Sequence, residues 1–377
     1  MDAAVAAAGG RVKHSTHRDL ISGKKKGPLA QAALWGLSVA SLFYGAAVRL
    51  RNRAFDVRLL RSHRAAVPVV SIGNLTAGGT GKTPMVAALT EWFTSRGVRP
   101  VILSRGYRSL SDAANDEKLV LDQLCPNVVH LQSPDRVASA ADAYAAQGAE
   151  VLLLDDGFQH RRLARDLDIV LIDALDPWGR GHLLPRGLLR EPRTALKRAD
   201  LVLLTRADQC ADEHKKRLLN EIRAAWNGRL PVEVVFRPVG LINTAGETRP
   251  IGSIAGPVAA FCGIGNPEAF RRSLETAGFQ GRLLGPRAFE DHHHYVPTDL
   301  AALADWAQSA GAAALVTTHK DLVKIPRTDL GGLPLWALAI RAEITAGREE
   351  LESQLRFFLP NAAQKKESSP ASGSTPS

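Results

Sequence analysis

The chain has 377 residues, which is enough for two modest domains and more than one minimal core requires. Its hydrophobic content of 45% and charged content of 23% are ordinary for a globular protein and exclude a chain that is disordered throughout. The formal net charge of +10 indicates an anionic partner, which could be nucleic acid, a phosphorylated substrate or an acidic bilayer.

The sequence has no paired-cysteine zinc spacing, no aromatic strand motif and no long Lys/Arg tail, so we expect no nucleic-acid partner. Its three cysteines, Cys125, Cys210 and Cys262, are odd in number and lie far apart. This pattern is typical of a reducing compartment, in which such residues serve as small core hydrophobes.

The N-terminal region divides into two segments of different composition. Residues 1–26 are Ala/Gly-rich and then polar and basic, without apolar periodicity, which predicts a disordered extension. The segment from Pro28 to Val48 carries no charge, and a helix of about 20 apolar residues would span a bilayer. A buried helix of a soluble protein and a cleaved signal peptide remain alternatives. The nucleotide-binding loop that follows argues against the signal peptide, because ATP is found inside the cell.

A basic stretch follows the apolar segment. Its arginines alternate with leucine and phenylalanine, which suits either an amphipathic helix on anionic headgroups or a solvated charged face. We therefore assign residues 27–65 to a membrane-associated apolar segment and basic helix. Because both flanks are positive, charge does not decide whether the segment crosses the membrane or lies in it. The arginines are Arg49, Arg51, Arg53, Arg58, Arg61 and Arg64.

Beyond Val67, Val/Ile/Leu-rich runs alternate with helical patterns, which predicts a parallel sheet covered on both faces. The fold class is therefore α/β, with a P-loop NTPase-like domain over residues 66–238 and a second, smaller α/β domain over residues 239–335. Residues 336–361 read as a linker strand and a closing amphipathic helix. The low-complexity tail, residues 362–377, is expected to be disordered.

The strongest local signal is a glycine-rich loop between a strand and a helix. Its backbone N–H groups would surround phosphate oxygens, Lys82 would reach the outer phosphates of ATP, and the Thr83 hydroxyl would hold Mg²⁺. The general pattern has glycine where this chain has Thr76, and a glycine-rich turn without a ligand is the alternative. The predicted loop consists of Thr76, Ala77, Gly78, Gly79, Thr80, Gly81, Lys82 and Thr83.

A second nucleotide-site element is an acidic residue at the end of a buried strand. The run VLLLDD ends in Asp155 and Asp156, and such carboxylates position the metal directly or through water. Arg105, at the end of the VILSRG strand, is a candidate phosphate contact.

Several motifs, in this order, resemble those of the tetraacyldisaccharide 4'-kinase family, the lipid A 4'-kinases, over roughly residues 27–360. In that family Thr at position 76 is usual. The motifs are SIGNLTAGGTGKTP, LSRGYRS, LLLDDGFQHRRL, GHLLPRGLLREP, FCGIGNPEAF, FEDHHHY and TTHKD.

The resemblance implies ATP-dependent phosphorylation of the 4'-hydroxyl of a tetraacylated glucosamine disaccharide 1-phosphate, a lipid A precursor, to give lipid IVA. It places the enzyme on the cytoplasmic face of the inner membrane, against an anionic surface, and we expect a monomer. It also implies two α/β domains joined by a two-stranded linker, with the C-terminal helix returning to the first domain.

The resemblance gives catalytic roles to two residues. Asp116 stands where the family has the acidic residue of Gly-Asp-Glu, and would accept the proton of the sugar hydroxyl. His292, in FEDHHHY, would pair with Asp116 across the domain cleft and tune it. Without the family, His292 and His294 on one strand face could be zinc ligands, although no further ligand is suitably spaced.

The remaining family positions concern the nucleotide, the metal and the lipid. Asp155 and Asp156 would organise metal and phosphate. Arg186 and Leu188 replace the usual Ala and Pro, so the acyl pattern of the acceptor stays open. The positions expected near the nucleotide or the acceptor are Gln159, His160, Arg190 and Glu191.

Two other classes of protein compete with the lipid kinase. A membrane-associated nucleotide switch would regulate a partner protein, but Thr205 to Asp208 lacks the Asn and Lys of a guanine-reading motif. A soluble small-molecule kinase would bury the Pro28 to Val48 segment in its core. A scaffold is least favoured, since it has no use for a phosphate loop.

Overall fold

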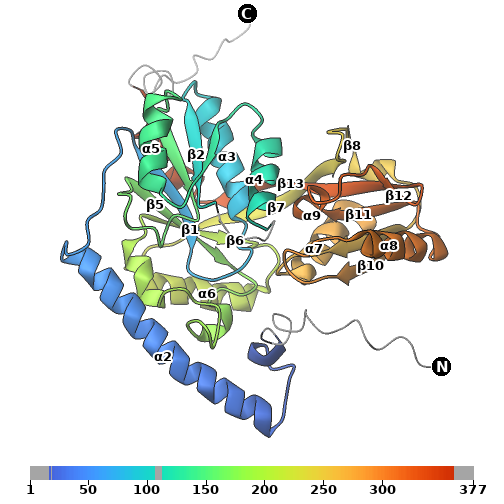
Figure 1. Cartoon of the computed structure of the whole chain (residues 1–377), viewed down its shortest axis with the longest axis horizontal. Coiled ribbons are helices and arrows are strands. Elements are labelled where there is room, and N and C mark those ends of the chain that lie inside the picture. Colours follow the sequence, from blue (N-terminus) through green and yellow to red (C-terminus); the bar gives the residue numbers. More distant parts are fainter. Residues whose placement is uncertain (1–16, 18, 107–112, 361–377) are drawn as a thin grey trace, which may run out of the picture.

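The computed structural model describes residue 17, residues 19–106 and residues 113–360. Figure 1 shows two lobes joined by two long strands, with helix α2 running along the outside of the first lobe. The residue ranges 1–16 and 362–377, which fall in the predicted disordered ends, lie outside the described residues. Within the predicted N-terminal extension, residues 19–21 are helical and Ile21 is buried.

The first lobe is a parallel sheet with helices on both faces, as the alternation of strand and helix patterns predicted. Near-continuous runs of buried Val, Ile and Leu form its strands, which is the composition expected when both faces of a sheet are covered. The strands are β1 (Val69–Asn74), β2 (Pro100–Ser104), β3 (His130–Gln132), β4 (Val151–Asp155), β5 (Leu167–Asp173) and β6 (Leu201–Thr205). The helices are α3 (Lys82–Thr94), α4 (Ala113–Leu124), α5 (Arg136–Ala145) and α6 (Asp212–Ala225).

The second lobe repeats this architecture on a smaller scale. Its parallel strands are β9 (Val258–Cys262), β10 (Leu283–Ala288) and β11 (Ala314–Thr318), and its helices are α7 (Pro267–Leu274), α8 (Pro297–Ser309) and the short α9 (His319–Leu322). The fold class predicted from the sequence is thus confirmed.

Two long antiparallel strands, β7 (Val232–Ile242) and β13 (Leu333–Ala346), connect the lobes. They merge both lobes into one sheet with the order β10-β9-β11-β13-β7-β6-β5-β1-β4-β2-β3. The two-residue strands β8 (Thr248–Arg249) and β12 (Asp329–Leu330) pair with β7 and β13 at the edge of this path. Short 3-10 helices cover Gly179–Gly181, Arg193–Arg198 and Ile251–Ser253, and a π-helical turn covers Glu275–Phe279.

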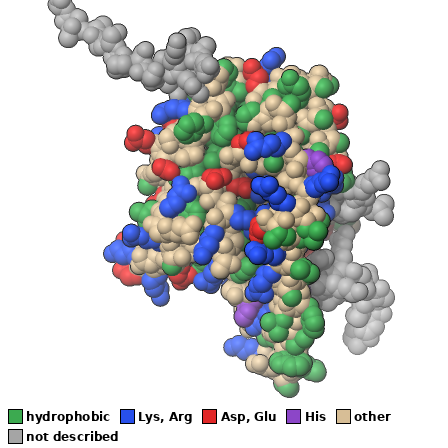
Figure 2. All heavy atoms as spheres, turned by 90° about the vertical axis from the view of Figure 1, so that its left-hand side faces the viewer, with side chains coloured by type: hydrophobic (Ala, Val, Ile, Leu, Met, Phe, Trp, Pro, Cys, Tyr) green, Lys and Arg blue, Asp and Glu red, His purple; other side chains and the backbone are tan. Residues whose placement is uncertain are grey.

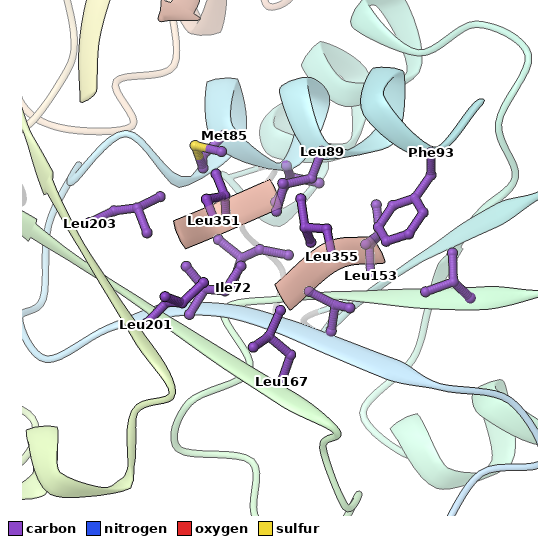
Figure 3. Packing of buried hydrophobic residues seen from close by; sticks show 14 of the residues in the cluster. Ile72, Met85, Leu89, Phe93, Leu153, Leu167, Leu201, Leu203, Leu351 and Leu355 are labelled. Carbon is purple, nitrogen blue, oxygen red and sulfur yellow. The ribbon is translucent and has the colours of Figure 1, made fainter. Parts of the chain in front are cut away.

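The last described helix, α10 (Arg348–Arg356), packs on the first lobe rather than the second. Leu351 and Leu355 are fully buried in the same cluster as Met85, Leu89 and Phe93 of α3 (Figure 3). The chain therefore leaves the first lobe, builds the second and returns, which ties the two lobes together at both crossings.

Helix α2 (Pro28–Asp56) is one continuous helix, although the sequence suggested an apolar segment followed by a separate basic helix reaching Arg64. Arg58, Arg61 and Arg64 lie beyond its end. The chain turns at Arg58, which has a φ of +60°, and then runs beside the first lobe, where the His63 N–H donates to the Arg162 carbonyl over 2.7 Å.

One edge of α2 is docked on the first lobe, and the rest of the helix faces outward. Gly45 and Val48 are buried, and the hydroxyl of Ser41 donates to the Leu183 carbonyl over 2.7 Å. In Figure 2, hydrophobic side chains gather on the projecting part of the molecule, with Lys and Arg side chains above them. The large exposed apolar residues of α2 are Leu29, Trp35, Leu42, Phe43 and Leu50.

Candidate functional site

The glycine-rich loop predicted from the sequence joins β1 to α3 and lines a cavity of about 630 Å³. Gly81 has a φ of +89°, and a Cβ there would lie 2.1 Å from the ring of Phe236, so the position requires glycine. Asn74 donates to the Thr80 hydroxyl over 3.0 Å, and the Thr205 hydroxyl donates to the Thr80 carbonyl over 2.9 Å. The loop is therefore braced from both sides.

Not every predicted loop residue faces this cavity. Residues 77–83 line it, whereas Thr76 does not. Thr76 forms an isolated antiparallel bridge with Leu189, and the adjacent Ala77 N–H donates to the Leu188 carbonyl over 2.7 Å. Thr76 thus fastens the loop to the segment that carries Arg190.

Three charged side chains meet beside the loop. Lys82 Nζ lies 3.4 Å from Asp156 Oδ1, and Arg190 Nη1 lies 2.9 and 2.7 Å from the two carboxylate oxygens of Asp156. Burial raises the pKa of Asp156, but the positive charges of Lys82 and Arg190 outweigh it and hold that pKa below its usual value. Asp156 therefore stays ionised and orients both cations toward the cavity.

Asp155, at the end of β4, has the opposite electrostatic environment. Burial, with a smaller contribution from the negative charge of Glu117, raises its pKa to about 7. Its Oδ1 atom is buried and has no hydrogen-bond partner in the described part of the chain. A carboxylate oxygen in this state is suited to a cation, which would replace the missing partner.

The residues around Asp155 fit Mg²⁺ better than zinc. Thr83 and the two aspartates supply the oxygen ligands that Mg²⁺ prefers, and Mg²⁺ takes its other ligands from water and substrate phosphates. Among the residues that the structure describes, no group of three or more His, Cys, Asp and Glu side chains could hold a metal ion. The zinc alternative for His292 and His294 is therefore not supported.

Asp116 and His292 approach each other from different lobes. His292 Nδ1 lies 3.7 Å from Asp116 Oδ2, and Asp116 is buried at the start of α4. His292 lines the cavity and has a φ of +60°, with its N–H donating to the Gly263 carbonyl over 3.0 Å. Asp116 does not itself line the cavity, whereas its neighbour Glu117 does.

Glu117 is held by the second lobe. Nζ of Lys320, the second residue of α9, lies 2.6 Å from Glu117 Oε1. The positive charge of Lys320 lowers the pKa of Glu117 to about 2, against the opposing effect of burial. Arg105 and Lys320 both line the cavity, so its walls come from both lobes and its charged groups are of both signs.

A family model described as Tetraacyldisaccharide-1-P 4'-kinase matches residues 33–359. The chain belongs to this family. The resemblance inferred from the sequence motifs is thereby confirmed, and with it the assignment to the kinases. The competing assignments to a nucleotide switch or a scaffold find no support among these relatives.

Individual relatives agree with the family model. The tetraacyldisaccharide 4'-kinase of Anaeromyxobacter sp. (strain K) is 42% identical over 363 residues, covering 90% of this chain and 95% of the relative. That of Syntrophus aciditrophicus (strain SB) is 40% identical, covering 82% and 88%. The crystal structure of LpxK from Aquifex aeolicus in complex with ATP superposes with a TM-score of 0.67 at 29% identity, covering 86% of this chain and 99% of that one.

Three residues that the sequence placed near the nucleotide or the acceptor do not line the cavity. They are Gln159, His160 and Glu191. The Gln159 side-chain amide donates to the Asn74 carbonyl over 3.0 Å. Burial, helped by the positive charge of Arg136, lowers the pKa of His160 to about 4. The hydrogen bond of Gln159 therefore ties the segment after β4 to the end of β1, next to the site.

Glu191 is fully buried and accepts hydrogen bonds from Arg198 over 2.9 and 3.1 Å and from Asn52 of α2 over 2.6 Å. It therefore joins the helix to the segment that carries Arg190. Of the two adjacent residues, Arg190 lines the cavity and Glu191 supports it from behind.

Three positively charged side chains in or beside this site were not predicted from the sequence. Arg136 donates to the Asp156 carbonyl over 3.1 Å. Arg206 contacts Asp173 over 2.5 Å and the Gly79 carbonyl over 3.1 Å. Lys324 contacts Asp116 over 3.1 Å. The nearest sequence signal for Lys324 was its place four residues after Lys320 of the TTHKD motif.

Proposed function

We propose that this chain transfers the γ-phosphoryl group of Mg-ATP to the 4'-hydroxyl of tetraacyldisaccharide 1-phosphate. The proposal rests on one observation above all: the phosphate-type loop of the first lobe and His292 of the second line the same cavity, with Asp116 directly behind His292. The acceptor is inferred from the name that the relatives share, tetraacyldisaccharide 4'-kinase.

The nucleotide would bind with its phosphates against the loop and the amino-terminal end of α3. The loop N–H groups and the helix dipole favour anions there. Lys82 and Arg190, oriented by Asp156, would contact the outer phosphate oxygens, and Arg190 can do so with two parallel hydrogen bonds. These groups stabilise the charge that spreads over the phosphoryl oxygens in the transition state.

Mg²⁺ would be held by Thr83, Asp155 and Asp156. When bound, it would neutralise negative charge on the β- and γ-phosphate oxygens. A cation at the unpartnered Oδ1 atom of Asp155 would favour the ionised form of this carboxyl, whose pKa is raised to about 7 by burial. Asp156 remains engaged with Lys82 and Arg190, which keeps these side chains directed at the phosphates.

The acceptor hydroxyl would enter from the side of Asp116 and His292. Its oxygen attacks the γ-phosphorus, the bond from that phosphorus to the β-phosphate bridging oxygen breaks with its electron pair passing to ADP, and the hydroxyl proton passes to Asp116. His292 holds the proton-accepting carboxylate in place from the second lobe. Asp116 is buried, so a small movement of α4 or of the 291–294 turn must bring the carboxylate to the acceptor.

Helix α2 would attach the enzyme to the membrane that holds the lipid. Within the described residues it alone is long and apolar enough to cross a bilayer, and only 6% of its most apolar stretch is buried. A core helix would be mostly buried. The exposed apolar residues of α2, with the arginines that follow them, suit the anionic cytoplasmic face of an inner membrane. A monomer bound there could reach the acceptor lipid.

The proposal is tested by incubating the purified protein with γ-labelled ATP and tetraacyldisaccharide 1-phosphate in detergent micelles. We expect label in the lipid, and its loss by at least ~100-fold in Lys82→Ala and Asp116→Ala. Lys118→Ala is the matched control, because Lys118 pairs with Asp122 of the same helix over 2.6 Å and does not line the cavity. Release of labelled phosphate with no label in the lipid would instead support a nucleotide switch.

A further inference from the structure

Among the described residues, the charged side chain nearest to Asp116 is that of Lys324, which no sequence motif indicated. Lys324 Nζ lies 3.1 Å from Asp116 Oδ2, nearer than His292 Nδ1 at 3.7 Å from the same oxygen. Both side chains of the closer pair are almost fully buried, with 6% of Lys324 and 5% of Asp116 exposed. A charged pair at this depth is shielded from water and is sensitive to geometry.

The other side of Lys324 is fixed to the core of the second lobe. Its Nζ lies 3.5 Å from Asp321 Oδ1. Asp321 is fully buried and accepts hydrogen bonds from the Gly263 N–H over 3.0 Å and from the Thr318 hydroxyl over 2.6 Å. Because Asp321 is held by its own neighbours, it fixes the position of the Lys324 ammonium.

This arrangement has a consequence for proton transfer. A buried carboxylate can accept a proton only if it was ionised before the reaction, and burial alone favours its neutral form. The ammonium of Lys324 lies 3.1 Å from Asp116 Oδ2 and balances the charge of that carboxylate within the buried pair. When Asp116 becomes protonated, Lys324 keeps Asp321 as a counter-charge, so the step leaves no isolated buried cation.

Geometry supports the same role. Lys324 and His292 both approach Oδ2 of Asp116, and no hydrogen bond to Oδ1 is formed by the described residues. These two contacts thus fix the carboxylate through one oxygen and leave the other to receive the hydroxyl proton. Lys324 does not line the cavity, so it acts through Asp116 and not on the substrate.

We propose that Lys324 is a positioning residue, which holds the Asp116 carboxylate in the orientation that the acceptor hydroxyl requires. This inference rests on the proposed function, since it assigns Lys324 a part in the same phosphoryl transfer. Lys320, four residues earlier, provides a comparison, because it pairs with Glu117 over 2.6 Å instead of Asp116.

The test is a double-mutant cycle in single-turnover assays with excess enzyme, using Asp116→Asn, Lys324→Met and both changes together. We expect Lys324→Met to lower the transfer rate constant by ~100-fold with a KM for ATP within about twofold of wild type. In the Asp116→Asn background the same change should have no further effect, because its target is already absent. Lys320→Met, the matched control, should lower the rate by a similar factor in both backgrounds.

Losses that multiply for Lys324→Met and Asp116→Asn would overturn the inference, as would an effect on KM for ATP alone. Lys324→Gln, which keeps a hydrogen-bond donor, is measured in parallel in case the methionine variant does not fold, and binding of a fluorescent ATP analogue reports on folding. Wild-type protein that transfers no phosphate to lipid would overturn the proposed function itself, which distinguishes the two failures.

Discussion

Asn52 of helix α2 donates its side-chain amide to Glu191 Oε2 over 2.6 Å, next to the arginine that contacts Asp156. The hydroxyl of Tyr44, two turns earlier on the same helix, donates to the Arg190 carbonyl over 3.0 Å. The helix proposed to attach the enzyme to the membrane is thus bonded directly to the segment that carries a cavity-lining cation.

Asn52→Ala should therefore weaken both stability and activity. Glu191 still accepts hydrogen bonds from Arg198 but loses the one from Asn52 at a buried oxygen. This loss lowers the free energy of unfolding by about 1–3 kcal/mol. We expect a lower free energy of unfolding in urea and a several-fold lower kcat, because Arg190 becomes less well placed. Ser38→Ala, which removes only a bond to Leu34 within the helix, is the control. An unchanged kcat in a destabilised variant would show that α2 does not position Arg190.

Gly81→Ala should disrupt the phosphate loop. The new Cβ would lie 2.1 Å from the ring of Phe236, in a backbone conformation with φ of +89°. We expect a lower melting temperature and a loss of ATP affinity of at least ~10-fold, measured by titration calorimetry. Gly79→Ala has no heavy atom within 4 Å of the new Cβ and no positive φ, so it should melt as wild type does. Equal melting temperatures for the two variants would contradict this account of the loop.

Stability should fall as the pH drops below about 6.5, in part because of His130. Burial lowers the pKa of His130 to about 4, from an ordinary value of 6.5, so the folded protein does not take up this proton until the pH is far lower than in the unfolded chain. Above pH 6.5 His130 is neutral in both states and costs no stability. As the pH falls from 6.5 to 4, up to about 3 kcal/mol of the free energy of unfolding is lost.

His130→Gln checks this prediction, since glutamine can still bond the Ser104 hydroxyl, which lies 2.8 Å from His130 Nε2. Urea unfolding at pH 5 and pH 7.5 should show a smaller difference in the variant than in wild type. A variant with the same pH dependence as wild type would mean that His130 is not a source of it.

Removing exposed apolar side chains from α2 should weaken membrane binding without unfolding the protein. Leu42 and Phe43 are 71% and 73% exposed, so Leu42→Ser with Phe43→Ser should leave the melting temperature near that of wild type. Sedimentation with anionic phospholipid vesicles should decrease by at least ~10-fold in affinity. The control for substitution as such is Thr94→Ser, at the last residue of α3, with Ser95→Thr, at the residue that follows it. Unchanged sedimentation of the α2 variant would contradict membrane attachment through this helix.

The sequence predicted features whose residues lie close together in the chain. The loop ending at Thr83 and the pair Asp155 and Asp156 follow buried strands, and parallel strands bring their carboxyl ends to one edge, so their meeting could be expected. The alternating strand and helix patterns likewise predicted the fold class.

Features that depend on side chains far apart in the chain could not be predicted. Lys324 contacts Asp116 across more than 200 residues, and nothing in the local pattern of either residue indicates the other. Glu191 was expected near the substrate because of its motif, but the structure turns it toward Arg198 and Asn52, where a buried carboxylate finds its hydrogen-bond donors.

The most direct test of the account is the position of the phosphate that the enzyme adds. Purified protein is incubated with Mg-ATP and tetraacyldisaccharide 1-phosphate, and the product is analysed by ³¹P NMR and mass spectrometry. We predict one new monoester phosphate, on the 4'-oxygen of the sugar, and none with Asp116→Ala. A phosphate on another hydroxyl, or full 4'-phosphorylation by Asp116→Ala, would contradict the assignment of Asp116 as the group that receives the acceptor's proton.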